Sequence, residues 1–371
     1  MDGRPQKRIL RVSDARNNVH DEISIRLRKE PHMKKIGRLV MSLGIIIFIL
    51  VSMAFPACAA HITSVSKNTD VKAESLTSDS KGDAAAKKNA VSAYEDFIKG
   101  KRTVVYHLAN VEITNIYLPK PFRDGKSYSL NDLINVFQKA ADEVNAENSQ
   151  SSKRASIKKV EYSILDESQN PVLALHIVGK NFLVSESTEM WYLIHYNSAG
   201  DQLNIAFGRD SWSRSRIRLN QSGVVICDGS GGAFDHGSDY YKIGSNGETI
   251  RIYSAVFSSF KAANDPELSD WDKGYTLAAY YLDTEEFSPQ GESNPADYYT
   301  LIHNNEADDT FRISSNTSID KKNPAYRLYA EDNIKIVEQN VVVKAIVKRM
   351  SEKNIHLESL YSDKPVWNKI K

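Results

Sequence analysis

Cysteine is scarce in this sequence, which contains only two residues of this type, Cys58 and Cys227. A chain with so few cysteines has no disulfide framework, so packing rather than cross-linking must stabilise its fold. The composition allows this, because 41% of the residues are hydrophobic and 26% are charged. Cys227 follows the apolar residues Val224 to Ile226. We therefore predict that its thiol lies in the core.

A strong charge of one sign is also missing. The formal net charge is +1, and the part of the chain after residue 60 is mildly acidic. Proteins that bind nucleic acid usually carry a basic patch, so this balance argues against a nucleic-acid partner. No internal repeat of fixed period occurs, which disfavours solenoid and propeller folds. No cysteine or histidine spacing typical of a metal site occurs, and we expect neither a metal nor another cofactor.

The sequence has only one long apolar run, Leu39–Ala57, "LVMSLGIIIFILVSMAFPA". It follows the basic cluster Met33–Arg38, "MKKIGR". A basic cluster before an apolar run is typical of a segment that directs secretion. The run ends in Ala57-Cys58-Ala59, a pattern of small residues that suits signal peptidase. We therefore expect residues 1–60 to form a cytoplasmic n-region plus a signal peptide or membrane anchor.

Three outcomes stay open for this segment. It is cleaved, or it is retained as an anchor of nearly the roughly 20 residues that cross a bilayer, or Cys58 is lipidated. The stretch Phe55-Pro56-Ala57-Cys58 resembles a bacterial lipobox, although Phe55 and Pro56 depart from its usual residues. Each outcome places the body outside the cytoplasm, secreted or anchored to the outer face of the cytoplasmic membrane. Met33 is an alternative start, since signal peptides rarely begin with a long polar stretch.

The rest of the chain divides by composition into a tether and a folded body. Residues 61–88 have almost no large apolar residue, and we predict a disordered tether there. Residues 89–260 are expected to form an α+β domain with an antiparallel sheet. Residues 261–371 are expected to form a C-terminal α/β extension, either part of the same domain or separate from it.

Apolar spacing predicts helices at both ends of the folded body. Apolar residues recur at intervals of three and four over 91–98, 130–144 and 334–350. Between Ile157 and Phe260 lie short runs rich in β-branched and aromatic residues, separated by turn residues. Strands in immediate succession favour antiparallel pairing. The expected fold class is α+β: a central antiparallel β-sheet with an N-terminal helical part and a C-terminal helix.

The stretch Ser211–Asn220, "SWSRSRIRLN", alternates between two sets of side chains. If it is one strand, four candidate binding residues share a face: Trp212, Arg214, Arg216 and Arg218. An aromatic ring beside three guanidinium groups predicts a platform for an anionic or sugar-like ligand. The alternative is a solvent-facing side of a strand whose arginines discourage pairing with other chains.

The stretch Val224–Gly244, "VVICDGSGGAFDHGSDYYKIG", concentrates residue types that are common in active sites. Its candidate binding residues are Asp228, Ser230, Asp235 and His236. Asp228-Gly229-Ser230-Gly231-Gly232 resembles the G-D-S-G-G loop of trypsin-like proteases, but a glycine separates the aspartate from the serine. A metal site built from the acidic residues and the histidine is a second alternative. We favour a glycine-rich turn between two strands, and we assign no catalytic residue.

Three segments follow one another in the central part of the chain: "YSILDESQNPVLAL", "RDSWSRSRIRLNQSGVV" and "GSGGAFDHGSDYYKIGSNGETIRIYS". In this order, over about Val91 to Ser258, the chain resembles a group of exported proteins and lipoproteins of gut Clostridia. No activity is established for that group. The resemblance therefore implies export in a Gram-positive bacterium and a β-rich body, but it identifies no catalytic residue.

The sequence predicts an exported protein, secreted or tethered to the membrane, with a non-catalytic role in binding or surface interaction. The expected partners are a cell-wall component or another anionic or glycan ligand, together with the membrane through the N-terminal segment. The alternative is an extracytoplasmic hydrolase that uses the loop Gly229–Asp239. At this stage both an enzyme and a binding module are open interpretations.

Overall fold

The computed structural model describes residues 80–113, 116, 118, 122–147, 154–166, 170–182, 185–212, 214–230, 233, 235–284, 294–303 and 321–370. The predicted export segment at 39–57, the lipidation candidate Cys58 and the predicted tether before residue 80 lie outside these residues. Within the described ranges, no helix is both long and apolar enough to cross a membrane.

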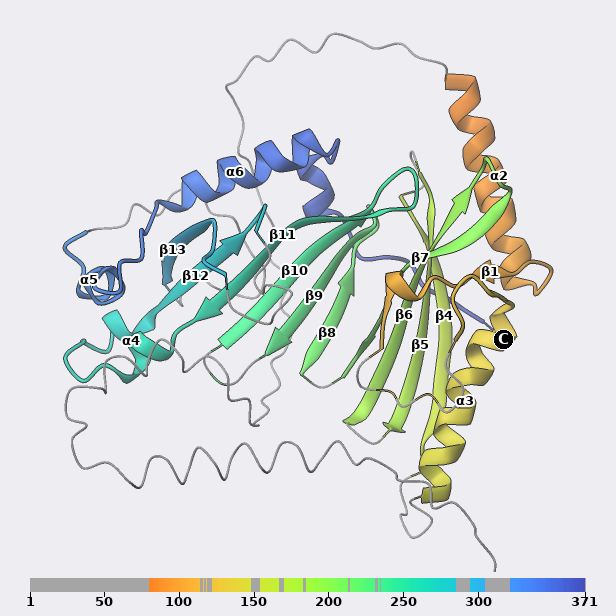
Figure 1. Cartoon of the computed structure of the whole chain (residues 1–371), viewed down its shortest axis with the longest axis horizontal. Helices are drawn as coiled ribbons and strands as arrows, with labels where there is room; N and C mark the ends of the chain where they lie inside the picture. Colours follow the sequence, from red (N-terminus) through yellow and green to blue (C-terminus); the bar gives the residue numbers. More distant parts are fainter. Residues whose placement is uncertain are drawn as a thin grey trace, which may run out of the picture. The chain divides into compact units, whose positions relative to one another are not determined.

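The fold is a mixed α+β arrangement of two mostly antiparallel sheets, with helices from both ends of the chain (Figure 1). The α-helices are α2 (Ser80–Ile98), α3 (Leu130–Glu147), α4 (Phe260–Asn264), α5 (Pro324–Ala330) and α6 (Gln339–Glu352). Short 3-10 helices occupy Leu108–Asn110, Asp272–Gly274 and Leu357–Tyr361. The predicted α+β class is thus confirmed, including its N-terminal and C-terminal helices.

The first sheet has eight strands in the order β14-β4-β5-β6-β7-β1-β3, with β2 also pairing with β7. Its long strands are β4 (Ser156–Leu165), β5 (Val172–Phe182), β6 (Ser185–Asn197) and β7 (Gln202–Ser211). Its short strands are β1 (Val104–Val105), β2 (Val111–Glu112), β3 (Ser127–Tyr128) and β14 (Asn368–Lys369). Only β1 and β2 run parallel to β7, and the other pairs are antiparallel.

The second sheet has six strands in the order β13-β12-β11-β10-β9-β8, and each strand pairs antiparallel with its neighbour. The strands are β8 (Ser215–Leu219), β9 (Val224–Ser230), β10 (Asp235–Ile243), β11 (Thr249–Ser258), β12 (Tyr275–Tyr281) and β13 (Tyr298–His303). Because β12 and β13 continue this sheet, the C-terminal extension shares it with the strands before residue 260.

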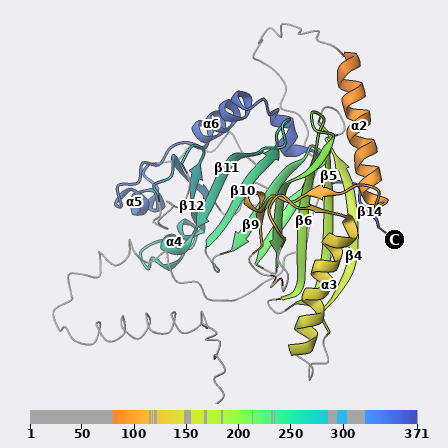
Figure 2. The same ribbon diagram turned by 45° about the vertical axis from the view of Figure 1, so that its right-hand side comes forward.

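Three apolar clusters connect the sheets and helices. On one face of the first sheet, Tyr94 of α2 and Phe137 of α3 are buried. On its other face, Leu193 belongs to a cluster with Val225 of the second sheet. α6 buries Ile346 against the remaining face of the second sheet. Figure 2 shows α3 in front of the first sheet and α6 along the second.

The antiparallel strands form two sheets. The division falls inside Ser211–Asn220, which was expected to be one strand. β7 ends at Ser211, Trp212 and Ser215 exchange backbone hydrogen bonds of 3.0 and 2.9 Å, and β8 begins at Ser215. The sequence pattern runs through this turn without a break and did not reveal it, but the pairing of Trp212 with Ser215 puts Trp212 on the face opposite to Arg216 and Arg218.

The two terminal helices differ from their predicted bounds. α2 begins at Ser80, inside the stretch predicted to be a tether. The alanines and lysines at 84–88 are strong helix formers, and they extend the turns that Tyr94 and Phe97 anchor in the core. α6 begins at Gln339, because Ile336 instead forms a parallel bridge with Tyr299 of β13.

Candidate functional site

Most of the predicted binding residues lie on the outer face of the second sheet, the face that α6 partly covers. In register, Asp228 pairs with Arg216 on one side and with Ser238 on the other. Residues directly opposite each other in paired strands point to the same side of the sheet. We call this surface the arginine face; its members are Arg214, Arg216, Arg218, Asp228, Ser230, His236 and Ser238.

Arg218 is held in one position by hydrogen bonds. Its Nε and Nη2 donate to the two carboxylate oxygens of Asp228, at 2.6 and 2.8 Å, and Ser238 Oγ donates to the same carboxylate at 2.8 Å. Burial would lower the pKa of Arg218, but the bonds to Asp228 outweigh it and the pKa is raised. The charges of Arg218 and Asp228 therefore compensate each other on a surface where both side chains are about one-quarter exposed, 25% and 26%.

Arg216 and Arg214 are in a different situation. Arg216 is exposed, and no acidic side chain in the described part of the chain forms an ion pair with it or with Arg214. Nη2 of Arg214 is buried and has no hydrogen-bond partner among the described residues. The arginine face therefore carries positive charge that the described part of the protein does not neutralise.

Ser230 and His236 occupy directly opposite positions of β9 and β10, so the serine and histidine of the predicted hydrolase lie on the same face. Asp228 lies two residues before Ser230 on that strand. Both of its carboxylate oxygens bind Arg218, and one also accepts from Ser238. The carboxylate that would have to orient His236 is thus engaged by other groups.

Two predicted site residues fall apart from the arginine face. Trp212 directly follows β7, before the turn, is half-buried, and does not continue the stripe of β8. Asp235 immediately precedes His236 in β10, and alternation along the strand points its side chain to the opposite face.

Cys227 also points away from the arginine face and into the cluster between the two sheets, where it is 7% exposed. Burial raises the pKa of its thiol to about 12, more than nearby Arg209 lowers it. A thiol with so high a pKa is a poor nucleophile at neutral pH. The prediction that Cys227 is a core residue is confirmed.

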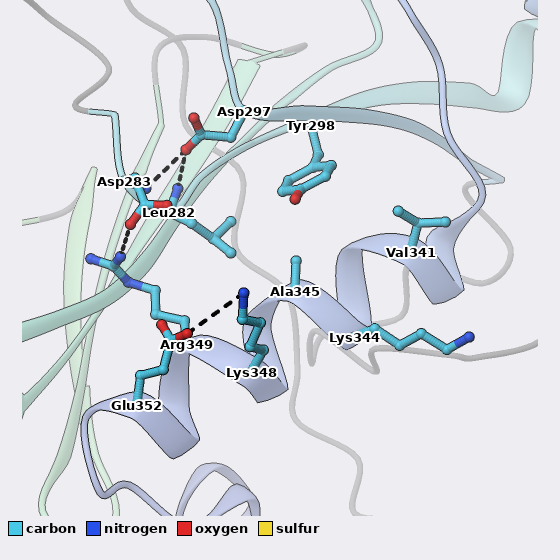
Figure 3. A pocket seen from close by; sticks show the side chains of 10 residues that line it. All are labelled: Leu282, Asp283, Asp297, Tyr298, Val341, Lys344, Ala345, Lys348, Arg349 and Glu352. Carbon is cyan, nitrogen blue, oxygen red and sulfur yellow. Dashed lines mark hydrogen bonds and ion pairs between the residues drawn. The ribbon is translucent and has the colours of Figure 1, made fainter.

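Sequence reasoning missed a pocket between α6 and the ends of β12 and β13 (Figure 3). Its volume is about 460 Å³. It is lined by Leu282, Asp283, Asp297, Tyr298, Val341, Lys344, Ala345, Lys348, Arg349 and Glu352. These residues come from two segments more than 40 positions apart, so no local motif pointed to them.

A buried acid and base cluster in the first sheet was also missed. Nδ1 of His176 lies 2.8 Å from Glu161 Oε1, and Nε2 lies 3.3 Å from Glu189 Oε2. The imidazole stacks on Trp191 with ring centroids 3.7 Å apart, and Trp367 packs beside both rings. The sequence held one hint of this cluster: a glutamate and a histidine occur in strands that are otherwise rich in apolar residues.

The described residues contain no group of three or more His, Cys, Asp or Glu side chains arranged to hold a metal ion. Comparisons of the chain with protein families, with curated proteins and with solved structures found no match.

Proposed function

We propose that the protein is an exported, non-catalytic binding module that recognises an anionic ligand, such as an acidic cell-wall glycan, through the arginine face. One observation carries the proposal: Arg216 is exposed and has no acidic partner among the described residues, while Arg218 beside it is fixed by Asp228. Guanidinium groups bind carboxylate and phosphate with two parallel hydrogen bonds, so an unpaired arginine on a rigid strand suits this ligand class.

The surroundings of Arg216 support a glycan more than a bare ion. Ser230 and His236 present polar groups one cross-strand row away, and His236 is exposed. Hydroxyl and imidazole groups donate to and accept from sugar hydroxyls. A hydrolase at the same loop is less well supported, because the carboxylate of Asp228 is bound to Arg218 and Ser238 rather than to His236.

The test is a binding measurement with three probes: a phosphorylated glycan, a carboxylated glycan and a neutral glycan of equal length. We expect binding to one or both acidic probes, weakened by salt, and no binding to the neutral probe. Arg216→Gln should weaken that binding roughly tenfold, because a charge-assisted hydrogen bond contributes about 1.5 kcal/mol or more.

Arg123→Gln is the matched control, because Arg123 is also exposed but lies in the loop before β3 of the first sheet. It removes the same charge from the protein and should leave the affinity unchanged. Equal losses for the two variants would mean that net charge alone attracts the ligand. Equal affinity for all three glycans would refute recognition of an anion.

Export is the second part of the proposal, and it is supported by the order of the basic cluster Met33–Arg38 and the apolar run Leu39–Ala57. The full chain expressed in a Gram-positive bacterium should be digested by protease added to intact cells. A variant lacking residues 39–57 should be protected inside the cell. Recovery of the intact full chain from the cytosol would contradict export. Labelling with a fatty-acid analogue, with Cys58→Ala as the control, separates lipidation from simple anchoring.

A further inference from the structure

The pocket beside α6 lies at the opposite end of the second sheet from the arginine face, because β13 and β8 are the two edges of that sheet. Its volume of about 460 Å³ is in the range of pockets that bind small molecules. One wall is a stripe of α6 residues, and the other is formed where β12 ends and β13 begins (Figure 3).

The acidic groups of the pocket are already engaged. Asp297 accepts hydrogen bonds from the backbone N–H groups of Leu282, Asp283 and Thr284 and from the hydroxyl of Thr284, at 2.7 to 3.2 Å. Burial would raise the pKa of Asp297, but these bonds outweigh it and lower the pKa. Asp283 forms an ion pair with Arg349. Arg349 neutralises Asp283, whereas the donors to Asp297 are neutral, so Asp297 keeps its negative charge on the strand side of the pocket.

The basic groups are less fully engaged. Lys348 lies 3.7 Å from Glu352, which is longer than a hydrogen bond, and its side chain is 79% exposed. Lys344 has no acidic partner in the described part of the chain. Nε of Arg349 is buried and has no hydrogen-bond partner among the described residues. The α6 side of the pocket therefore offers the exposed ammonium group of Lys348 to an anion.

The remaining lining is apolar and includes an aromatic ring. In Figure 3 the ring of Tyr298 lies across the opening from Ala345, with Leu282 on one side and Val341 on the other. Val341 is 41% exposed, which is unusual for a large apolar side chain next to a pocket. The ammonium group of Lys348 points toward the space between Leu282 and Ala345.

We propose that this pocket is a second binding site, specific for a small organic anion in which a carboxylate or phosphate is attached to a flat ring. The ring packs against Tyr298 and Ala345, and the anionic group approaches the ammonium group of Lys348. The proposal does not depend on the arginine face, because its residues and its ligand are separate.

Saturation-transfer NMR with the full chain and benzoate as the probe tests this proposal, with benzamide as the neutral analogue and inorganic phosphate as the ringless anion. We expect a signal for benzoate, a much weaker one for benzamide, and displacement of benzoate only at high phosphate concentration. Lys348→Gln should weaken benzoate binding roughly tenfold. Folding of this variant is not at risk, because the side chain is mostly exposed.

Lys353→Gln is the matched control, because Lys353 is an exposed lysine just after α6 that does not line the pocket. Arg216→Gln should also leave benzoate binding unchanged, which separates this site from the arginine face. Equal signals for benzoate and benzamide, no signal for benzoate, or unchanged binding in Lys348→Gln would each overturn the proposal.

Discussion

The two sheets each contain a network of acidic and basic side chains, but the networks differ in their access to solvent. In the first sheet, His176 and Glu161 at the centre of the network have side chains only 7% and 8% exposed, whereas Glu189 at its edge is 31% exposed. In the second sheet, Arg218 and Asp228 are 25% and 26% exposed. Trp191 and Trp367 pack against the first network, whereas the second lies beside the exposed Arg216.

This difference separates a structural role from a binding role. Groups that are sealed by aromatic rings cannot meet a ligand, so they act on the stability of the fold. Groups that keep contact with water contribute less to stability, but they hold neighbouring side chains in position for a partner. The same residue chemistry thus has opposite consequences in the two sheets.

The largest expected effect is that of His176→Ala on stability. The substitution leaves Glu161 and Glu189 without their common partner and removes the ring stacked on Trp191. Removing the donor from a buried charged acceptor costs about 3 kcal/mol or more. Urea unfolding measures this loss. His236→Ala is the matched control on the exposed face, and it should change the unfolding free energy by about 0.5 kcal/mol or less.

Trp367→Ala tests whether the packing of Trp367 keeps water away from the network of the first sheet. Loss of the indole ring should cost about 2 kcal/mol through lost apolar burial and aromatic contact. It should also expose Trp191, so acrylamide should quench tryptophan fluorescence more strongly. Val366→Ala next to it should have little effect, because Val366 is 75% exposed. Unchanged quenching in Trp367→Ala would mean that this residue does not seal the network.

Acid should weaken the network of the first sheet. Burial would raise the pKa values of Glu161 and Glu189, but hydrogen bonds from Lys159, His176 and Trp191 outweigh it and lower both. A carboxyl with a lowered pKa in the folded state stabilises the fold above its ordinary value of 4.5. That contribution disappears as the pH falls through the lower folded value.

The urea midpoint should therefore decrease when the pH is lowered from 7 to below 4.5. In Glu161→Gln the decrease should be smaller, because one of the two groups no longer titrates. An equal decrease in the variant and the wild type would show that other carboxyl groups cause the acid sensitivity.

Much of the fold was predictable because local patterns determine it. The periodicity of apolar and β-branched residues predicts α3 and the strands β4 to β11. The apolar neighbours of Cys227 predict that its thiol is buried. The division into two sheets was not predictable, since the sequence pattern continues without a break where Trp212 pairs with Ser215 and the chain reverses. Only the position of β8 at an edge beside β9 places Arg216 opposite Asp228.

The candidate sites, like the fold, were predictable only where they depend on residues close in sequence. Arg216, Asp228, Ser230 and His236 were found because they are close in sequence, and the structure places them on one face. The pocket beside α6 and the pairing of Glu161 with His176 depend on contacts between distant segments. Such contacts are fixed by strand register and helix docking, which a single sequence does not specify.

Arg218→Gln should have the smallest effect on stability and completes the comparison. It removes the partner of Asp228, which is about one-quarter exposed, so we expect a loss of about 1 kcal/mol in urea unfolding, well below that of His176→Ala. The freed carboxylate of Asp228 would then lie beside Arg216 and compete with an anionic ligand. Glycan affinity should therefore decrease more than stability does. A loss as large as that of His176→Ala would instead assign the arginine face to the structural core of the second sheet.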